Sequence, residues 1–300
     1  MAGFYTLFMD PTDDPQAYIS VSDSINASID TALRFVGKDL DTRGSCNGLI
    51  LARRYEYHAT NYYVCNPVAK SWTCVQNINL DGNSSLFLAF DPHVSFHFTL
   101  LRLELNDRNY CLKFAKYSSR TLTWTYHRVS TEPADYYFRR NGGKVYLNGV
   151  FHMVSSQNYI LGIDLESLVC RRIKMSGMMI GSDVLGKSQG RLHCAMAMEQ
   201  VGGIKEISVW MLEDYEKGEW VLKHRVVMEF FYSIMEVHPD KDVIFLRKQT
   251  IYGKKLKSYN MKNGELKEVC DLKDWGWGFC SLCVFSPYNG KDYLENKRDA

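Results

Sequence analysis

Residues 44–72 hold the pattern that decides the fold: GSCNGLIL at Gly44–Leu51, YYVCNP at Tyr62–Pro67 and KSW at Lys70–Trp72. A turn that contains glycine opens a strand, a second strand follows, and a strand with an aromatic residue closes the unit. Weaker copies of this cassette follow towards the C-terminus. Repeats of this size indicate an array of small β-sheets, an architecture that more often binds than catalyses.

Turn signals set the phase of the repeat. Asn47-Gly48, Asn148-Gly149 and Gln189-Gly190 each precede a short apolar strand, and openings without glycine are predicted near residues 86 and 241. Successive openings lie about 40 to 60 residues apart, which brackets the length of a propeller blade. The pattern predicts an all-β β-propeller of about six blades, with five or seven as alternatives. Pairing of the two chain ends would close such a ring and remove its exposed edges.

Composition limits the class of protein and its partners. The chain has 300 residues, 46% of them hydrophobic, and a formal net charge of +2, which argues against bulk attraction to nucleic acid or an anionic membrane. No run approaches the roughly 18 apolar residues of a membrane helix, and Met1–Asp10 lacks the regions of a signal peptide. We therefore predict a cytoplasmic and/or nuclear protein with no nucleic-acid or membrane partner, whose nine cysteines are reduced.

The cassette at residues 44–72 resembles the opening of the F-box-associated, kelch-like domain of plant F-box proteins. In that family a C-N-G-L strand is followed by N-P-x-T-K-x-W. Here Cys46–Leu49 and Asn66–Trp72 match, with Ala69 in place of the usual threonine. The family's next landmarks are resembled, in the same order, by Phe90–Phe98, Tyr117–Trp124 and Leu147–His152.

The resemblance extends over roughly residues 3–287 and implies a domain organisation. Residues 44–288 form the F-box-associated propeller, residues 1–43 contribute strands, and residues 289–300 are a charged, disordered tail. Family members carry an F-box of about fifty residues ahead of this domain, and Ala2–Tyr5 resembles the segment just after it. We therefore expect a chain without the F-box, as a truncated gene model, an isoform or a diverged member.

The function implied by the resemblance is protein recognition without catalysis, as in the substrate receptor of an SCF-type E3 ubiquitin ligase. The partner is a target protein that the sequence does not name, and an SCF adaptor is expected only if a longer form carries an F-box. Two alternatives remain open. One is a propeller enzyme that processes glycosides, which needs two carboxylates at the mouth of the ring. The other is a glycan-binding module.

One motif competes with the propeller prediction. Gly181–Ser188, GSDVLGKS, satisfies the expression for a phosphate-binding loop, which wraps phosphate with backbone amides at the start of a helix. Glycine follows two residues later at Gly190, in the same turn that opens a repeat, and glycine is a poor helix former. We therefore predict a blade turn at this position and no nucleotide cofactor.

Metal sites are not indicated either. Cys280 and Cys283 have C-x-x-C spacing, but no second pair completes a tetrahedral set, and positions i and i+3 of a strand face opposite sides. His93 and His97 are four apart in a stretch that is not helical. His152 and His193 occupy equivalent repeat positions, which favours repeat structure over a shared site. We predict no metal, no cofactor and no catalytic residue.

Clusters of aromatic residues are the candidate binding sites. They occur at residues 136–138, 230–232 and 275–279, and each combines several large rings. Most such rings pack between blades, but any that are exposed serve as anchors for a partner, because Trp and Tyr dominate interface hot spots. Among them we select four partner-binding candidates: Tyr136, Tyr137, Trp275 and Trp277.

Overall fold

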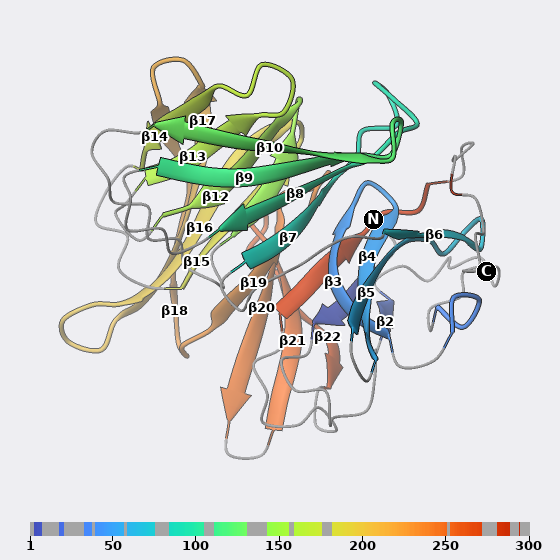
Figure 1. Cartoon of the computed structure of the whole chain (residues 1–300). Coiled ribbons are helices and arrows are strands. Elements are labelled where there is room, and N and C mark those ends of the chain that lie inside the picture. The colour runs from blue at the N-terminus through green and yellow to red at the C-terminus, as the bar shows by residue number, and fades with distance from the viewer. Residues whose placement is uncertain are drawn as a thin grey trace. The chain divides into compact units, whose positions relative to one another are not determined.

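The described part of the chain consists of β-strands joined by turns and loops. The computed structural model describes residues 3–7, 18–20, 33–37, 40–56, 59–75, 84–104, 111–130, 143–155, 159–175, 182–250, 253–271, 281–288 and 294. Every regular element among these residues is a β-strand, and neighbouring strands run antiparallel (Figure 1). The predicted all-β class is confirmed.

The chain divides into two compact units, Met1–Ala134 with Gly276–Ala300, and Asp135–Trp275. The first unit contains two four-stranded sheets and one three-stranded sheet. Its strands are β1 (Gly3–Leu7), β2 (Tyr18–Ser20), β3 (Leu40–Cys46), β4 (Leu49–Glu56), β5 (Ala59–Asn66), β6 (Ser71–Val75), β7 (Ser84–Ala89), β8 (Thr99–Glu104), β9 (Cys111–Ser118), β10 (Thr123–Ser130) and β23 (Ser281–Phe285).

The second unit contains three four-stranded sheets. Its strands are β11 (Lys144–Leu147), β12 (Val150–Val154), β13 (Tyr159–Asp164), β14 (Cys170–Lys174), β15 (Ser182–Ser188), β16 (Arg191–Glu199), β17 (Lys205–Asp214), β18 (Glu219–Met228), β19 (Ser233–Val237), β20 (Val243–Thr250), β21 (Gly253–Asn260) and β22 (Leu266–Asp271). In all five four-stranded sheets the strands neighbour each other in sequence order, which is the meander of a propeller blade. Five such blades lie within the predicted range of five to seven.

The two ends of the chain meet in the sixth, three-stranded sheet. β23 pairs with β1 through five residue pairs, from Gly3 opposite Phe285 to Leu7 opposite Ser281. The Ser45 hydroxyl also donates a hydrogen bond to the Val284 carbonyl, which ties β23 to β3. Pairing of the N- and C-terminal strands was predicted and is confirmed.

The predicted glycine turns are tight hairpin turns. Asn47-Gly48, Asn148-Gly149 and Gln189-Gly190 have positive φ at both central residues, with values between 46° and 95°. This is the type I′ geometry whose twist matches that of paired strands. Each turn joins the first strand of a blade to its second, at β3–β4, β11–β12 and β15–β16.

The predicted phase of the repeat was wrong by one strand, because a blade begins before its glycine turn. The predicted opening near residue 86 is itself a first strand, β7, whereas the other openings precede second strands. Because one predicted opening marks a first strand and the others mark second strands, the predicted distances between successive openings are uneven. The first strand β11, KVYL, is short and carries no turn residue of its own, so nothing in its sequence marks where its blade starts.

A second turn recurs in all five blades, between the third and fourth strands. Its first residue accepts hydrogen bonds of 2.7 to 3.3 Å from backbone N–H groups two or three residues further on. These first residues are Asn66, Ser118, Asp164, Asp214 and Asn260. Its fifth residue has a positive φ of 54° to 72°, at Lys70, Leu122, Leu168, Gly218 and Gly264. The physical basis of this repeat is a short polar side chain that accepts hydrogen bonds from the backbone N–H groups of its own turn.

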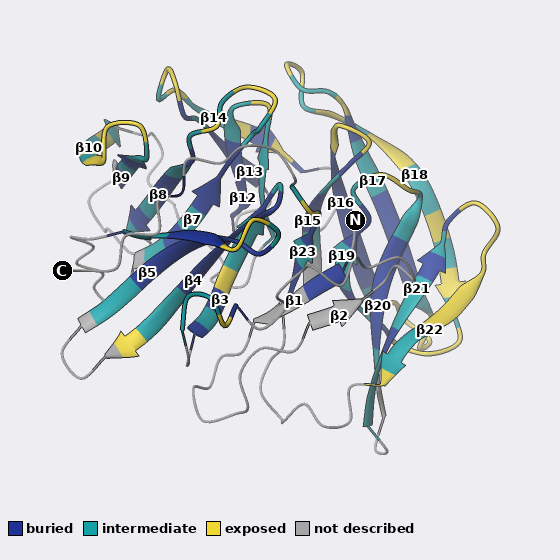
Figure 2. Ribbon diagram, turned by 90° about the vertical axis from the view of Figure 1, so that its right-hand side faces the viewer, coloured by how far each residue is buried: buried dark blue, intermediate teal, exposed yellow. Residues whose placement is uncertain are grey.

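The cores lie between the sheets of each unit. In the first unit Trp72, which closes the opening cassette, packs with Tyr63 at a ring distance of 5.7 Å, in a cluster that also holds Ile50 and Phe285. In the second unit one cluster centres on Leu192 and Cys194, and another on Val209 and Ile244. Figure 2 shows buried residues along β16, β17 and β20, and exposed residues along β18 and β22, the last strands of their blades.

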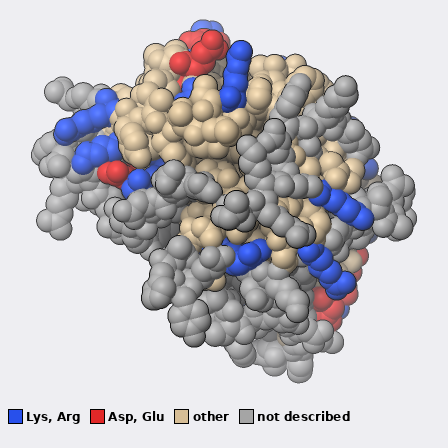
Figure 3. Space-filling view, turned by 45° about the vertical axis from the view of Figure 1, so that its right-hand side comes forward, with Lys and Arg blue, Asp and Glu red and all other residues tan. Residues whose placement is uncertain are grey.

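On the face that Figure 3 draws, the described Lys and Arg side chains lie in several separate places, and Asp or Glu side chains lie beside some of them. Within the described ranges, no helix has the length and apolar character that crossing a membrane requires.

Candidate recognition surface

Two neighbouring phenylalanines are exposed between β18 and β19. Phe230 and Phe231 each keep 43% of their surface accessible, whereas Tyr232 keeps only 5%. Tyr232 belongs to the core cluster that contains Ile207 and Val209. Because Tyr232 anchors the loop from below, the two phenylalanine rings are held outward on a short segment. Large rings fixed in this way lose little entropy when a partner covers them.

Other exposed apolar side chains lie at the same end of this blade. Lys205 is opposite Met228 in the β17–β18 ladder, so the β16–β17 turn and the β18–β19 loop leave the same end of the sheet. The exposed apolar residues on these two segments and at the end of β18 form what we call the Phe230 surface: Val201, Ile204, Val227, Phe230 and Phe231. Beside the rings is a shallow hollow whose lining includes Met198 and Met228. Flexible methionine side chains adapt readily to an incoming apolar group.

Polar groups border the Phe230 surface and fix its geometry. The Lys248 ammonium lies 3.3 Å from the centre of the Phe230 ring, a cation–π contact. Glu206, also in the lining, is held by an ion pair with Arg225 at 3.2 Å and by hydrogen bonds from Ser208 and Gln200 at 2.9 and 3.1 Å. An apolar centre with an ordered polar rim is the usual anatomy of a protein–protein interface.

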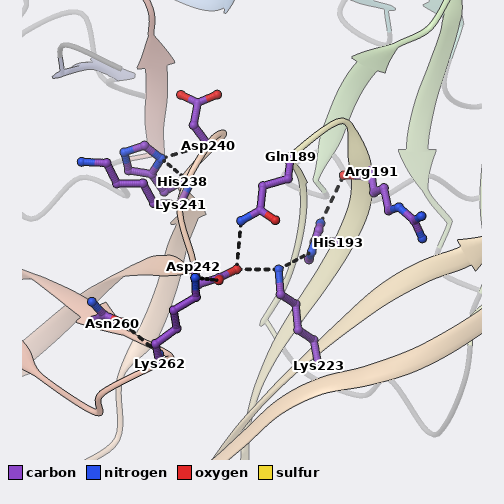
Figure 4. Close-up of polar contacts among 10 residues, drawn as sticks. All are labelled: Gln189, Arg191, His193, Lys223, His238, Asp240, Lys241, Asp242, Asn260 and Lys262. Carbon is purple, nitrogen blue, oxygen red and sulfur yellow. Dashed lines mark hydrogen bonds and ion pairs between the residues drawn. The ribbon is translucent and has the colours of Figure 1, made fainter.

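A polar cluster around Asp242 is the other conspicuous feature of the second unit (Figure 4). The Asp242 carboxylate, in the β19–β20 turn, lies 2.6 Å from Lys223 Nζ on β18 and 3.1 Å from Lys262 Nζ in the β21–β22 turn. The Gln189 amide, in the β15–β16 turn, donates to it at 3.1 Å. Hydrogen bonding from Lys223 is the main reason that the pKa of Asp242 lies below its ordinary value.

The histidines of this cluster are neutral. His193 Nδ1 donates to the Arg191 carbonyl at 3.1 Å, so its Nε2 accepts from Lys223 at 3.3 Å. His238 Nδ1 accepts two backbone N–H groups, from Asp240 and Lys241, at 3.0 and 3.2 Å. Burial lowers the pKa of His193 and lowers that of His238 to about 4. Each imidazole therefore completes a structural hydrogen-bond network, and Asp242 serves to join four segments of two neighbouring sheets.

Acid–base chemistry by two carboxylates finds little support in the described part of the chain. The hollow beside Phe230 contains Glu206 as its acid, and a larger hollow on β8–β10 contains Glu104. Neither hollow has a second carboxylate among the described residues that line it. Within the described ranges, no group of three or more His, Cys, Asp or Glu residues is arranged to hold a metal ion.

The four residues selected from the sequence lie outside the described residues. Tyr136, Tyr137, Trp275 and Trp277 therefore stay predictions. The remaining aromatic cluster, residues 230–232, is described, and the structure divides it into two exposed rings and one buried ring. The run of three aromatic residues indicated the site, but adjacent residues in a loop follow no regular alternation, so which rings face solvent could not be predicted from their order.

The segment that matches a phosphate-binding loop is a strand. Ser182–Ser188 is β15, and the turn Gln189-Gly190 leads into β16. A phosphate-binding loop requires a helix after its Lys-Ser pair, because the phosphate lies at the helix N-terminus. A strand lies there instead, as predicted from Gly190.

The sequence also contains a histidine pair and a cysteine pair whose spacing resembles that of metal ligands. His93 and His97 lie in the loop between β7 and β8, where their backbone N–H groups donate to Asp91 and Ser95 at 3.0 Å. Cys283 is a buried residue of β23, and Cys280 lies outside the described residues.

His152 and His193 occupy equivalent positions, each the third residue after the glycine of a hairpin turn, and both are buried. Their partners differ, since His152 Nε2 shares a 3.0 Å hydrogen bond with the Tyr215 hydroxyl, whereas His193 contacts Lys223. Their equivalence therefore reflects repeat structure, as predicted.

Comparison with known proteins agrees with the observed architecture. The family described as F-box protein At3g26010-like, beta-propeller, matches residues 21–297. Among curated proteins no match is found. Among solved structures, the crystal structure of TolB from Acinetobacter baumannii is similar with a TM-score of 0.51 and 10% sequence identity, over 94% of this chain and 66% of that one. At this identity the similarity concerns the fold alone, and the chain spans just under two thirds of the length of TolB. The match over residues 21–297 shows that the chain belongs to the F-box protein At3g26010-like beta-propeller family.

Proposed function

We propose that this chain is a non-enzymatic recognition domain that binds a target protein for an SCF-type E3 ubiquitin ligase. In this role the propeller presents the target, and an F-box, on a longer form of the chain or on an associated protein, connects it to the ligase through the SCF adaptor. Such a protein acts in the cytoplasm or the nucleus. The family to which the chain belongs supports the link to F-box proteins.

The exposed phenylalanine pair is the observation that carries the proposal for binding. Phe230 and Phe231 are apolar, accessible and held by buried Tyr232. Exposing two large rings is unfavourable for an isolated protein, and a patch of this kind marks an interaction site. Covering both rings with a partner removes apolar area from water, and each aromatic anchor contributes about 2 kcal/mol or more at the centre of an interface.

The test compares the wild-type chain with the Phe230→Ala/Phe231→Ala variant. Both are expressed with an affinity tag in cells, and the proteins bound to each are quantified by mass spectrometry with and without proteasome inhibition. We expect at least one protein that binds wild type, that accumulates when the proteasome is inhibited, and that is lost about tenfold or more from the variant. Components of a cullin ligase are expected only when an F-box is supplied, by a longer form of the chain or by an associated protein.

The matched control removes apolar side chains elsewhere in the same unit. Val169→Ala/Leu266→Ala replaces two other exposed residues of the second unit, and it should keep the target. The proposal fails if no protein depends on Phe230 and Phe231, or if the dependent partner shows no change in ubiquitination or abundance when the chain is deleted.

A further inference from the structure

Lys248 is a half-buried cation at the edge of the Phe230 surface. On β20 the side chains of Ile244, Leu246 and Lys248 share one face of the sheet, because alternate residues of a strand project to the same side. Ile244 and Leu246 are fully buried in the core cluster that contains Tyr232, so Lys248 lies where this core ends. Its ammonium rests 3.3 Å from the centre of the Phe230 ring.

Lys248 forms no ion pair with a carboxylate of the described residues. It is directly opposite Lys255 on β21, with Lys257 one pair further along the same face, and like charges in this arrangement repel. The two acids on this face, Glu268 and Asp271, lie opposite Lys257 and Lys255 on the outer strand β22. Glu268 binds Lys255 at 2.9 Å. Because Lys248 is one strand further in, on β20, the ring is the contact that it makes.

The other charges at the border of the Phe230 surface are paired or exposed. Lys205 lies 3.6 Å from Glu199, and Arg225 lies 3.2 Å from Glu206. Glu229, at the start of the β18–β19 loop, is exposed. An exposed carboxylate at the rim stays hydrated when a partner binds, whereas an ammonium that rests on a contact ring loses its water. Lys248 is therefore the charge whose surroundings a partner changes most.

A partner on Phe230 has to compensate this change. The ring keeps 43% of its surface accessible while Lys248 rests on it, so a partner that packs against the ring also displaces water from the ammonium. Burial of a charge without a counter-charge is unfavourable and opposes binding. The cation–π contact is already present in the free protein, so it provides no new compensation. The compensating negative charge has to come from the partner.

We propose that the segment of the target protein that covers Phe230 and Phe231 carries an aspartate or glutamate next to its apolar residues, and that this carboxylate binds the Lys248 ammonium. The inference rests on the proposed recognition function and deepens it by giving the partner a chemistry. The apolar residues of the segment fill the hollow beside Met198 and Met228, and the carboxylate makes a charged hydrogen bond next to the Phe230 ring. Lys248 selects among apolar segments, because a segment with lysine or arginine at this place is repelled.

The test selects binders from a displayed library of random peptides on three immobilised proteins: the wild-type chain, Lys248→Met and Lys248→Glu. The library is first depleted on the Phe230→Ala/Phe231→Ala variant, which removes peptides that bind elsewhere. We expect the wild-type pool to be enriched in Asp and Glu beside aromatic or aliphatic residues. The Lys248→Met pool should lose this enrichment, and the Lys248→Glu pool should be enriched in Lys and Arg instead. Equal charge in the wild-type and Lys248→Glu pools overturns the proposal, as does the absence of any peptide that depends on the two phenylalanines.

A double-mutant cycle with one peptide of the wild-type pool tests the contact itself. Fluorescence anisotropy with the full chain measures the affinity of this peptide and of a version in which its acid is replaced by the corresponding amide. On the wild-type chain the replacement should weaken binding about tenfold, and on Lys248→Met it should change binding little. The affinity of the acidic peptide should also fall as salt is raised. Equal losses on the two proteins overturn the proposal.

The matched control is Lys241→Met, which removes an exposed cation in the turn at the other end of β19 and should leave the affinity of the peptide unchanged. Methionine keeps the aliphatic part of the lysine side chain, and circular dichroism confirms that each variant is folded. Peptide pools without a charge preference refute the role of Lys248 alone. The proposed function is refuted separately, in cells, if no target protein depends on Phe230 and Phe231.

Discussion

Lys223 Nζ lies 2.6 Å from the Asp242 carboxylate, so an ion pair joins β18, the outermost strand of one sheet, to the turn between β19 and β20 of the next sheet. The two side chains are 23% and 12% exposed, and Lys262 and Gln189 reach the same carboxylate. Charged hydrogen bonds in partly buried positions are stronger than those in full solvent. Asp242 therefore stabilises the junction of two blades in the second unit.

Replacing Asp242 by Asn and Lys223 by Met should destabilise the fold non-additively. We expect a coupling free energy of about 1 kcal/mol in a double-mutant cycle measured by urea unfolding. The matched control is Lys255 with Glu268, 2.9 Å apart and 44% exposed on both sides, whose coupling should be about 0.3 kcal/mol. A coupling at Asp242 no larger than that of the control would contradict its assignment as a junction.

Asp164 begins the recurring turn of the third blade, and its carboxylate accepts two backbone N–H groups at 2.9 and 2.7 Å. Asp164→Ala leaves these donors to water and should reduce the free energy of unfolding by about 1 kcal/mol. Chemical denaturation measures the change. Asp164→Asn keeps an acceptor oxygen and should recover most of the loss, whereas equal destabilisation by Asn and Ala would show that the hydrogen bonds are unimportant.

Leu168, the fifth residue of the same turn, has a φ of 61°, in the region that favours glycine. Leu168→Gly should be neutral or stabilise the protein by up to about 1 kcal/mol, because relief of strain outweighs the added freedom of the unfolded chain. Leu168→Val should destabilise it, since a β-branched residue fits positive φ worst. Thermal unfolding ranks the three proteins, and a ranking with Val above Gly would refute the assigned backbone strain.

The three aromatic residues 230–232 should differ sharply in their effect on stability. Tyr232→Ala removes a buried ring from a core cluster and should cost about 3 kcal/mol. Phe230→Ala/Phe231→Ala removes exposed rings and should cost less than about 1 kcal/mol, mostly from the Lys248 contact. Differential scanning calorimetry compares the two variants. If the double variant is as unstable as Tyr232→Ala, the phenylalanines belong to the core and the recognition surface lies elsewhere.

Acid should destabilise the protein through buried histidine. Burial lowers the pKa of His152 to about 4, below its ordinary value of 6.5. Between these two pH values His152 is therefore mostly protonated in the unfolded chain and mostly neutral in the folded chain. Between pH 6.5 and about 4 this favours unfolding by about 1.4 kcal/mol for each pH unit. His238 acts in the same direction, and Glu236, whose pKa is raised to about 7 by burial, acts in the opposite one.

His152→Gln isolates the contribution of that histidine. Glutamine does not titrate, so the free energy of unfolding of the variant should fall less between pH 6.5 and 4.5 than that of the wild type, and the difference should shrink above pH 7. Urea unfolding at each pH measures both proteins. Parallel pH profiles would show that His152 takes up its proton as readily in the folded chain as in the unfolded one.

Much of the fold could be predicted because turns are local. Asn47-Gly48, Asn148-Gly149 and Gln189-Gly190 marked hairpins correctly, since positive φ at two successive residues restricts the choice of residue. The recurring turn at Asn66, Ser118, Asp164, Asp214 and Asn260 could have been found in the same way, but Asn, Asp and Ser are frequent in all loops and the turn tolerates Leu or Lys at positive φ. First strands carry no such mark, so the phase of the repeat was displaced by one strand.

The candidate site, unlike the turns, depends on contacts between residues that are distant in the sequence. The cluster at residues 230–232 was visible in the sequence, but the exposure of Phe230 and Phe231 depends on how Tyr232 enters the core between strands distant in sequence. The same holds for the hollow on β8–β10, where Tyr126, Ala115 and Arg102 become neighbours only through strand pairing.

The sequence by itself determined that this chain is an all-β propeller of a recognisable family, because turn geometry and strand alternation are properties of a few adjacent residues. The tertiary structure decided which apolar rings and which cations reach the surface together, and which carboxylate joins two blades. These are properties of pairs such as Lys223 and Asp242, whose separation is fixed by the packing of sheets rather than by their positions along the chain.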